Sequence, residues 1–323
     1  MKNIKNFIKE SIKKLRFNKK RSALLADSVK FSYDEREILR DINLNVREGS
    51  STAIIGKSGC GKSTFLKLAA GIISKRYFGN IAILGRSKVF TKDQVGFVPQ
   101  ELAFIPDLSL LDNIKIAGLN NGMTERAAVK KAQQLMRMLK LEEDINKKPT
   151  ELSGGQKVRL NIILSLLHSP KVLILDEPFV ALDFFNRRLL WQFLESMRKK
   201  GKSIIITSHL LSEVQEHVDR LIIIKDGKVF FSGKIDALKE KLKMKYVFEL
   251  KFFYLSKENL NRIKKYCAYK DIKILDTYER YMMFALNSKI ARPVLLHMFN
   301  KLKLKYEEID LREPNLDEIF LKT

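Results

Sequence analysis

The sequence predicts an α/β core followed by a small α+β domain with a ferredoxin-like arrangement. The first observation is a glycine-rich loop at residues 56–63, which follows a short apolar strand and opens a helix. The second is an uninterrupted apolar strand that ends in the carboxylates of Asp176 and Glu177. The third is a change of pattern after about residue 240, where strands and helices follow the order β-α-β-β-α-β.

Length and composition are those of a globular protein with about two domains. The chain has 323 residues, of which 45% are apolar and 30% charged, so we expect no general disorder. Its two cysteines, Cys60 and Cys267, cannot form a disulfide framework or a metal cluster, which favours a reducing compartment. No apolar run approaches the length of a membrane span, so we expect the chain not to cross a membrane by itself.

The formal net charge of +24 is high and is densest near the N-terminus. Residues 1–21 carry +8, residues 241–323 carry +7, and the remaining +9 is spread over the long middle. Such a charge suits nucleic acid or an anionic membrane surface, and charge alone does not choose between them.

Residues 1–22 are predicted to form a basic amphipathic helix. Lysines fill one face of this helix. The other face carries five apolar residues at helical spacing: Ile4, Phe7, Ile8, Ile12 and Leu15. This helix could lie on anionic lipid or against a membrane partner. The alternative, a solvated and partly frayed leader, stays open.

The core domain, residues 23–240, is predicted from patterns that change along the chain. Period-two alternation, short apolar runs and glycine or proline stops predict strands at 28–33, 38–46, 52–55, 79–85 and 95–100, with a helix at 65–71. Residues 101–168 form a helical insertion, with helices at 108–117, 126–139 and from the N-cap Ser153 to about 167. Strands at 171–175, 203–207, 221–224 and 228–231 then alternate with helices at 185–199 and 212–218.

The accessory domain, residues 241–323, is predicted from a second alternation of patterns. Strands are predicted at 245–254, 273–276, 281–286 and 306–311, helices at 257–266 and 290–303, and a last turn at 316–321. This order is the basis for the predicted ferredoxin-like arrangement.

The glycine-rich loop has the pattern of a phosphate-binding loop. Its glycines let successive backbone N–H groups face an anion, and the following helix adds its positive dipole end. The loop predicted to bind the nucleotide consists of Gly56, Lys57, Ser58, Gly59, Cys60, Gly61, Lys62 and Ser63, followed by Thr64. Lys62 would reach the β- and γ-phosphates, and the hydroxyl of Ser63 would bind Mg²⁺. The alternative is a glycine-rich turn that happens to end in Lys-Ser.

The two carboxylates downstream of this loop suit the chemistry of Mg²⁺ and ATP. Phosphoryl transfer needs positioned phosphates, neutralised charge and an aligned water. Asp176 is predicted to hold Mg²⁺, and Glu177 is predicted to be the base that polarises the water. Taken alone, the pair could be a strand end with solvated charges.

One further element, Leu152-Ser153-Gly154-Gly155-Gln156, lies between the loop and the two carboxylates. With it, residues 24–235 resemble the ATP-binding subunits of ABC transporters. The resemblance implies a P-loop NTPase core with an antiparallel β subdomain and a helical subdomain. It also implies an Mg²⁺-dependent ATPase in which Ser153, Gly154, Gly155 and Gln156 contact the ATP that a second subunit holds.

Four other positions match the motifs of this family. The resemblance implies that Tyr33 stacks on adenine, Gln100 touches Mg²⁺ and the attacking water, and His209 contacts the γ-phosphate. Ala181-Leu182-Asp183 resembles the loop that crosses the dimer interface. A lone histidine is more often structural, but its place after a buried strand favours the catalytic role.

The resemblance also implies partners and a location. Two ATPs would join this chain to a second ATPase subunit, identical or different, and a separate transmembrane permease subunit would carry the substrate. The chain would then lie on the cytoplasmic face of a membrane as a peripheral protein, and we expect no nucleic-acid partner.

The family pattern is not followed everywhere. Ala181 stands where the family usually has glycine, bulky Phe179 and Val180 precede it, and the neighbours of Arg159 are altered. These departures put the fine geometry of the dimer interface in doubt, while every catalytic position is present.

The end of the chain favours an exporter. Residues 313–321 resemble the Pro-x-Leu-Glu-x-x-Phe ending of exporter-type ATPases that handle drugs, antibiotics or lipids. The alternatives are an importer ATPase and a soluble ABC protein that acts on nucleic acid or the ribosome. The chain has a single set of motifs and no long coiled coil or zinc cysteines, which disfavours the last alternative.

Overall fold

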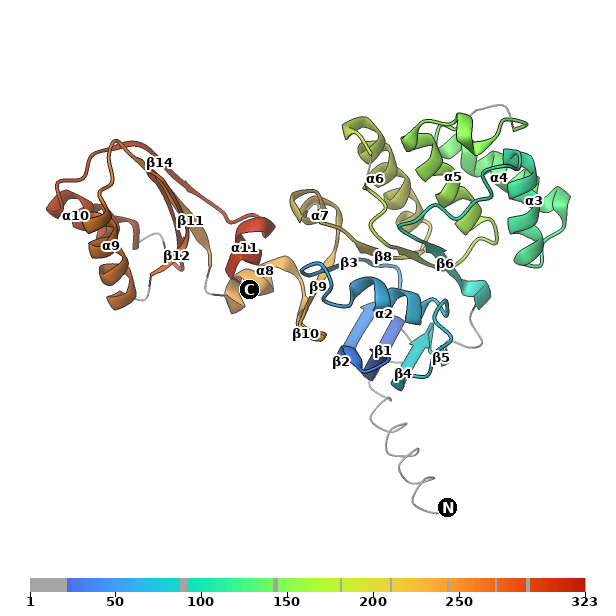
Figure 1. Ribbon diagram of the computed structural model, residues 1–323, viewed down its shortest axis with the longest axis horizontal. Coiled ribbons are helices and arrows are strands. Elements are labelled where there is room, and N and C mark those ends of the chain that lie inside the picture. The colour runs from blue at the N-terminus through green and yellow to red at the C-terminus, as the bar shows by residue number, and fades with distance from the viewer. Residues whose placement is uncertain are drawn as a thin grey trace, which may run out of the picture. The chain divides into compact units, whose positions relative to one another are not determined.

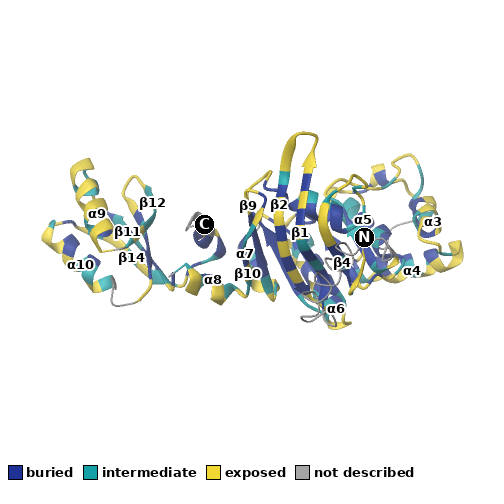
Figure 2. Cartoon of the chain, turned by 90° about the horizontal axis from the view of Figure 1, so that it is seen from below, coloured by how far each residue is buried: buried dark blue, intermediate teal, exposed yellow. Residues whose placement is uncertain are grey.

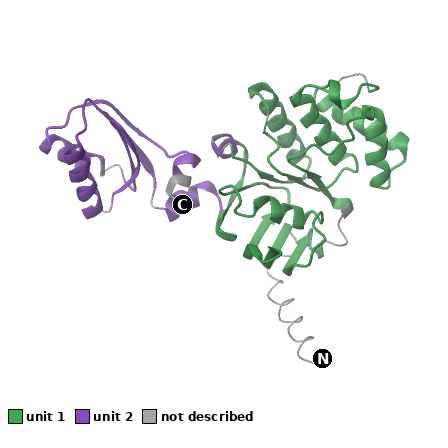
Figure 3. Cartoon of the chain, in the orientation of Figure 1, with its two compact units in different colours: residues 1–209, 217–232 green, residues 210–216, 233–323 purple. Residues whose placement is uncertain are grey.

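The computed structural model describes residues 22–87, 92–141, 145–180, 182–209, 211–242, 244–270, 272–288 and 291–322. The helix predicted for residues 1–22 lies outside the described residues, except that Ser22 begins a strand. The chain forms two compact units, which Figures 1 and 3 show in ribbon form. The first unit contains residues up to 209 and 217–232, and the second contains 210–216 and the chain from 233 onward.

The centre of the first unit is a six-stranded sheet in the order β10-β9-β3-β8-β7-β6. Its strands are β3 (Ser51–Ile55), β6 (Val95–Val98), β7 (Val172–Leu175), β8 (Ser203–Thr207), β9 (Arg220–Lys225) and β10 (Lys228–Gly233). The pairs that join β9, β3, β8, β7 and β6 are parallel. Every residue of β3, β7 and β8 is buried, which is why these segments are continuous apolar runs in the sequence.

A four-stranded antiparallel sheet forms the second layer of this unit, in the order β2-β1-β4-β5. It contains β1 (Ser22–Tyr33), β2 (Arg36–Arg47), β4 (Phe78–Ile83) and β5 (Arg86–Ser87). Buried and exposed residues alternate along the second halves of β1 and β2, and Figure 2 shows both kinds in this sheet. Apolar residues of both sheets and of helix α2 (Lys62–Ala69) form one core, so the phosphate loop is held between the two layers.

The predicted helical insertion is present. It contains α3 (Leu110–Asn120), α4 (Glu125–Met138) and α5 (Gly154–Leu166), and α6 (Phe184–Lys199) follows β7. Ser109, Thr124 and Ser153 cap the N-termini of the first three helices with their side chains, which is the role that the sequence predicts for Ser153. Two short 3₁₀ turns, Lys92–Gln94 and Pro149–Glu151, lead into β6 and α5.

The second unit has its own antiparallel sheet in the order β12-β13-β11-β14. The elements are α7 (Leu211–His217), α8 (Ile235–Lys241), β11 (Tyr246–Phe252), α9 (Lys257–Tyr269), β12 (Lys273–Tyr278), β13 (Tyr281–Leu286), α10 (Ala291–Lys301), β14 (Tyr306–Arg312) and α11 (Leu316–Lys322). From β11 to β14 the order is the predicted β-α-β-β-α-β, and the sheet order is that of a ferredoxin-like arrangement. Its core is a separate cluster that includes Phe248, Phe284 and Phe299.

Among the α-helices and strands of the described residues, α8 and β5 are absent from the sequence-based prediction. Helix α8 has seven residues and one fully buried side chain, Leu238, so it offers no apolar periodicity to detect. Strand β5 has only two residues. The structure also places α8 in the second unit, which begins its long segment at Gly233 and not at residue 241.

Candidate functional site

The phosphate loop joins the end of β3 to the start of α2. Gly59 and Gly61 have φ angles of +76° and +105°, a left-handed conformation that glycine adopts without strain. A side chain on Gly56 would place its Cβ 2.3 Å from the carbonyl oxygen of Ile224. The loop therefore needs glycine at these positions for its curvature and for its close packing on β9.

The start of α2 is open to an anion. Gly61 caps the helix without a side-chain hydrogen bond, so no side chain from the cap position competes for the first backbone N–H groups. The ammonium group of Lys62 is buried and donates to the carbonyl oxygens of Gly56 at 2.9 Å and Lys57 at 3.3 Å. This geometry can accommodate phosphate groups at the loop.

Residues at the carboxyl ends of β7 and β8 meet the loop. The hydroxyl of Ser63 donates to Asp176 Oδ1 at 2.9 Å, and the hydroxyl of Thr207 donates to the same oxygen at 2.7 Å. Thr207 Oγ1 also accepts a hydrogen bond of 2.8 Å from the backbone N–H of Glu177. A single buried hydroxyl thus joins Asp176 to Glu177. The sequence patterns assign Thr207 no role of its own, because it stands there only as the last residue of a strand that leads to His209.

Glu177 is buried beside His209. Its Oε1 lies 3.0 Å from His209 Nε2, and the Glu177 side chain is 7% exposed while that of His209 is 57% exposed. Burial raises the pKa of the Glu177 carboxyl, and the nearby His209 and Lys62 oppose the rise. A carboxylate with a raised pKa is a stronger base than one in water.

A pocket of about 310 Å³ opens over these groups. It brings together predicted residues from four segments: Ser58, Gly59, Gly61, Lys62, Ser63, Thr64, Gln100, Glu177 and His209. It also includes Arg36 and Ile38 of β2, which no motif indicates, because only the packing of the antiparallel sheet brings them there.

Some predicted site residues do not line this pocket. Tyr33 is 39% exposed and packs edge-on against Phe31, with the ring centroids 4.8 Å apart. Its ring also has the Lys75 ammonium 5.8 Å from its centroid. Ser153, Gly154, Gly155 and Gln156 lie at the start of α5 and are likewise outside the pocket lining. The described residues of one chain therefore do not join these positions to the phosphate loop.

The start of α5 has its own rigid geometry. Ser153 and Gln156 form a capping box, in which Gln156 Oε1 accepts from the Ser153 N–H at 2.7 Å and Ser153 Oγ accepts from the Gln156 N–H at 3.3 Å. Asn186 of α6 lies against Gly155, since a Cβ there would be 2.8 Å from Asn186 Nδ2. Arg159 of α5 donates to Asn186 Oδ1.

The loop that precedes α6 is joined to this arrangement. Asn186 donates to both carboxylate oxygens of Asp183, from its backbone N–H at 2.8 Å and its amide at 2.7 Å. The backbone hydrogen bond lowers the pKa of Asp183. Ala181 lies outside the described residues, and Phe184 and Phe185 beyond it are 62% and 78% exposed.

The residues fit a magnesium ion. Asp176 is 1% exposed, and among the described residues its Oδ2 has no hydrogen-bond partner. The Ser63 hydroxyl lies beside the same carboxylate. The described residues hold no group of three His, Cys, Asp or Glu side chains that could ligate a metal. Mg²⁺ needs no such group, because it binds through one or two protein ligands together with phosphates and waters.

A search of the described residues finds no helix long and apolar enough to cross a membrane.

Comparisons with known proteins agree with this geometry. The ABC transporter family matches residues 39–180. The chain is 28% identical over 302 residues to the linearmycin resistance ATP-binding protein LnrL of Bacillus subtilis, which covers 92% of this chain and 97% of that protein. It is 36% identical over 217 residues to the lantibiotic transport ATP-binding protein SrtF of Streptococcus pyogenes, and this alignment covers 66% of this chain and 92% of that protein. It is also 33% identical over 206 residues to the osmoprotectant import ATP-binding protein OsmV of Salmonella typhimurium, and this alignment covers 61% of this chain and 54% of that protein.

A solved structure is similar to about two thirds of the chain. It is a dimeric ATP-binding cassette in a post-hydrolysis state with ADP and Pi, and it has a TM-score of 0.59 and 28% identity. The match covers 66% of this chain and 98% of that one. The chain therefore belongs to the ATP-binding proteins of ABC transporters, a family of ATPases that bind and hydrolyse ATP.

Proposed function

We propose that this chain is the ATPase subunit of an ABC exporter, in which it dimerises around two ATP molecules and drives a separate transmembrane permease subunit. The observation that carries the proposal is the distribution of the site residues. The phosphate loop, Gln100, Glu177 and His209 line one pocket, while residues 153–156 lie elsewhere in the chain. A second subunit that contributes its own residues 153–156 would complete the site.

Within this pocket each residue has a role that its position supports. Lys62 and the loop backbone would bind the β- and γ-phosphates, and Ser63, Asp176 and Gln100 would hold Mg²⁺. A magnesium ion held there would supply positive charge against the charge that develops on the phosphates. Glu177 accepts the proton of the attacking water at its buried carboxylate.

His209 and the adenine contact complete the assignment. His209 lies beside Glu177 Oε1, lines the pocket and is more than half exposed, so it can contact both the base and the γ-phosphate. Tyr33 is exposed and can offer a ring face to adenine if it turns from its contact with Phe31.

The dimer follows from the geometry at the start of α5. Its N-terminus carries a positive dipole end, and its capping box keeps the Ser153 and Gln156 side chains in place. In a dimer, two ATPs would each join the loop of one subunit to this helix of the other. Hydrolysis would remove that bridge and loosen the pair, which can drive a permease.

The exporter assignment rests on the second unit. The alignment with the linearmycin resistance protein covers 92% of this chain and so extends through most of the accessory domain. The matched importer aligns with 61% of the chain. We therefore favour export of an antibiotic-like or lipid-like compound, with the chain peripheral on the cytoplasmic face of the membrane.

A substitution at the proposed base tests the function. In Glu177→Gln, ATP binding should persist because the amide keeps the shape of the carboxylate, while hydrolysis should fall about a thousandfold because the proton acceptor is lost. With Mg-ATP the variant should accumulate as a dimer in size-exclusion chromatography. If Glu177→Gln hydrolyses ATP like the parent, the assignment of the base is wrong.

The partner is tested with the same variant. Tagged Glu177→Gln, purified from gently solubilised membranes with Mg-ATP, should bring a polytopic membrane protein with it, and the parent with ADP should bring less. Co-purification of ribosomes or nucleic acid without a membrane protein would support the soluble alternative. A substrate-binding protein found with the permease would support the importer.

A further inference from the structure

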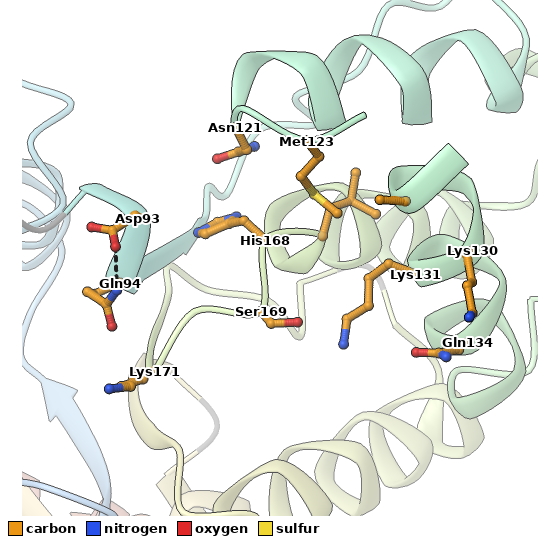
Figure 4. Close-up of a pocket in the computed structure, with 12 residues that line it drawn as sticks. Asp93, Gln94, Asn121, Met123, Lys130, Lys131, Gln134, His168, Ser169 and Lys171 are labelled. Atoms are coloured by element: carbon orange, nitrogen blue, oxygen red, sulfur yellow. Dashed lines mark hydrogen bonds between the residues drawn. The ribbon is translucent and has the colours of Figure 1, made fainter. Parts of the chain in front are cut away.

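A second pocket of the first unit, shown in Figure 4, shares no residue with the nucleotide pocket. Its volume is about 590 Å³, within the usual range for small-molecule sites. It lies where α4 of the helical insertion faces the amino ends of β6 and β7. Glu177, by contrast, follows the carboxyl end of β7, so the two pockets lie at opposite ends of the strands of this sheet.

The lining of this pocket is basic. Lys130 and Lys131 come from α4 and Lys171 comes from the turn before β7, and Figure 4 shows the α4 lysines and Lys171 on different sides of the pocket. Ala127, Lys130, Lys131 and Gln134 are three or four residues apart, so one face of α4 carries them toward the pocket. Within the described parts of the chain, none of the side-chain ammonium groups of these three lysines has a hydrogen-bond or ion-pair partner.

Opposing charge in the lining is small. Among the residues that the structure describes, Asp93 is the one carboxylate that lines the pocket, and it accepts a hydrogen bond from the side chain of Gln94. Three lysines therefore face one acidic group, which leaves a concave surface with a net positive potential that attracts anions.

A fourth cation lies just outside the lining. Lys202 donates to the carbonyl oxygen of Ser169 at 3.1 Å and also to that of Pro170. Burial lowers the pKa of Lys202, and the charges of Lys131 and Lys200 lower it further. Lys131, Lys200 and Lys202 thus add positive charge near this end of the strands, and a bound anion would reduce the repulsion among them.

We propose that this pocket binds a small anion that carries at least two phosphate groups. Each lysine ammonium is a compact charge that can pair with one phosphate, and these lysines lie on different walls of the pocket. A ligand with a single phosphate would therefore leave some of the ammonium groups unpaired. Met123, Ala127 and Leu167 add apolar side chains to the lining, against which the organic part of a phosphate ester could pack. Because α4 and the strand edge both contribute, an occupied pocket ties the helical insertion to the sheet.

Inorganic tripolyphosphate is a suitable probe, and isothermal titration calorimetry is the measurement. The experiment uses the full chain with Lys62→Ala, which weakens anion binding at the nucleotide pocket. Tripolyphosphate should bind this variant at about one site per chain, and adding Lys130→Ala and Lys131→Ala should weaken that binding at least tenfold. Rising salt should reduce the affinity, since the contacts are electrostatic.

A matched pair of lysines controls for net charge. Lys264 and Lys265 are adjacent and exposed on α9 of the second unit, and replacing both by alanine removes the same charge. That control should bind tripolyphosphate like Lys62→Ala alone. No binding to Lys62→Ala, or equal weakening in the two lysine pairs, would overturn the proposal. Binding of single-stranded RNA with no binding of tripolyphosphate would also overturn it and indicate a nucleic-acid surface.

Discussion

At the scale of single residues, the geometry of the proposed base depends on a threonine hydroxyl. Glu177 has a φ of +51°, a left-handed conformation that costs a residue with a side chain about 1 kcal/mol or more. The hydrogen bond from its N–H to Thr207 Oγ1 stabilises this turn, and the same hydroxyl donates to Asp176. Thr207 therefore sets the positions of the two carboxylates relative to each other.

Replacing Thr207 tests this positioning role. Thr207→Val keeps the shape but removes the hydroxyl, which leaves a buried N–H and a buried carboxylate oxygen each short of one partner. We expect kcat for ATP hydrolysis to fall about tenfold or more, with KM for ATP changed less than about twofold because Thr207 does not line the pocket.

Thr207→Ser is the matched control, since it keeps the hydroxyl and should restore most of kcat. Steady-state ATPase assays at saturating Mg²⁺ give both parameters. A Thr207→Val variant with the parent kcat would show that the hydroxyl does not position the base.

At the scale of one element, the end of the chain is held by a network that explains part of its motif. Glu318 is 4% exposed and completes a capping box with Asn315, the residue before α11. Its carboxylate accepts from the Asn315 N–H at 2.8 Å, while Asn315 Oδ1 accepts from the Glu318 N–H at 2.9 Å. Arg312 of β14 forms a two-pronged ion pair with the same carboxylate, which raises the pKa of Arg312. Leu316 and Ile319 are buried by this docking. Part of the motif at residues 313–321 therefore serves to stabilise the start of α11 and to hold this helix against β14.

Removing the carboxylate should destabilise the second unit. Glu318→Ala removes the carboxylate half of the capping box and leaves Arg312, whose side chain is 36% exposed, without its main partner, so we expect a loss of about 1–3 kcal/mol in the free energy of unfolding. Glu318→Gln keeps a capping acceptor and should cost less. Urea unfolding measures the effect, and Glu308→Ala at an exposed position of β14 is the control. Equal midpoints for Glu318→Ala and Glu308→Ala would contradict the role of the network.

At the scale of the whole molecule, the two units have separate cores and separate reporters. The single tryptophan, Trp191, is buried in the first unit against Phe179, with ring centroids 4.5 Å apart. Cys267 is 1% exposed in the second unit, where burial raises the pKa of its thiol to about 12. A thiol with that pKa and burial should not react until its unit opens.

These reporters predict how nucleotide stabilises the chain. At about a hundred times its Kd, Mg-ADP should stabilise the unit that binds it by about 2.7 kcal/mol. The urea midpoint from Trp191 fluorescence should therefore rise by about 1 M, whereas the midpoint for alkylation of Cys267 should not change. Equal shifts of both midpoints would mean that the two units unfold as one.

The strand and helix patterns predicted most of the architecture. Buried parallel strands such as β7 and capped helices such as α5 carry their signals within ten or fifteen residues. Helix α8 and strand β5 carry no such signal, because one buried residue or a two-residue strand has no period. Because α8 was not predicted, the boundary between the two domains was placed after residue 240, whereas the structure assigns the chain from Gly233 onward to the second unit.

By itself, the sequence determined the groups that depend on local spacing. A loop that binds phosphate, a helix start that follows it and two carboxylates at a strand end are built from neighbours in the chain, so their chemistry is visible without the fold. Tertiary structure decided which distant groups meet. Thr207 reaches Asp176 only because β7 and β8 pair in parallel, and Arg36 reaches the nucleotide pocket only because the antiparallel sheet packs on α2. The lysines of α4 and Lys171 share a pocket for the same reason: side chains far apart in sequence come together only when buried apolar faces bring their backbones into contact.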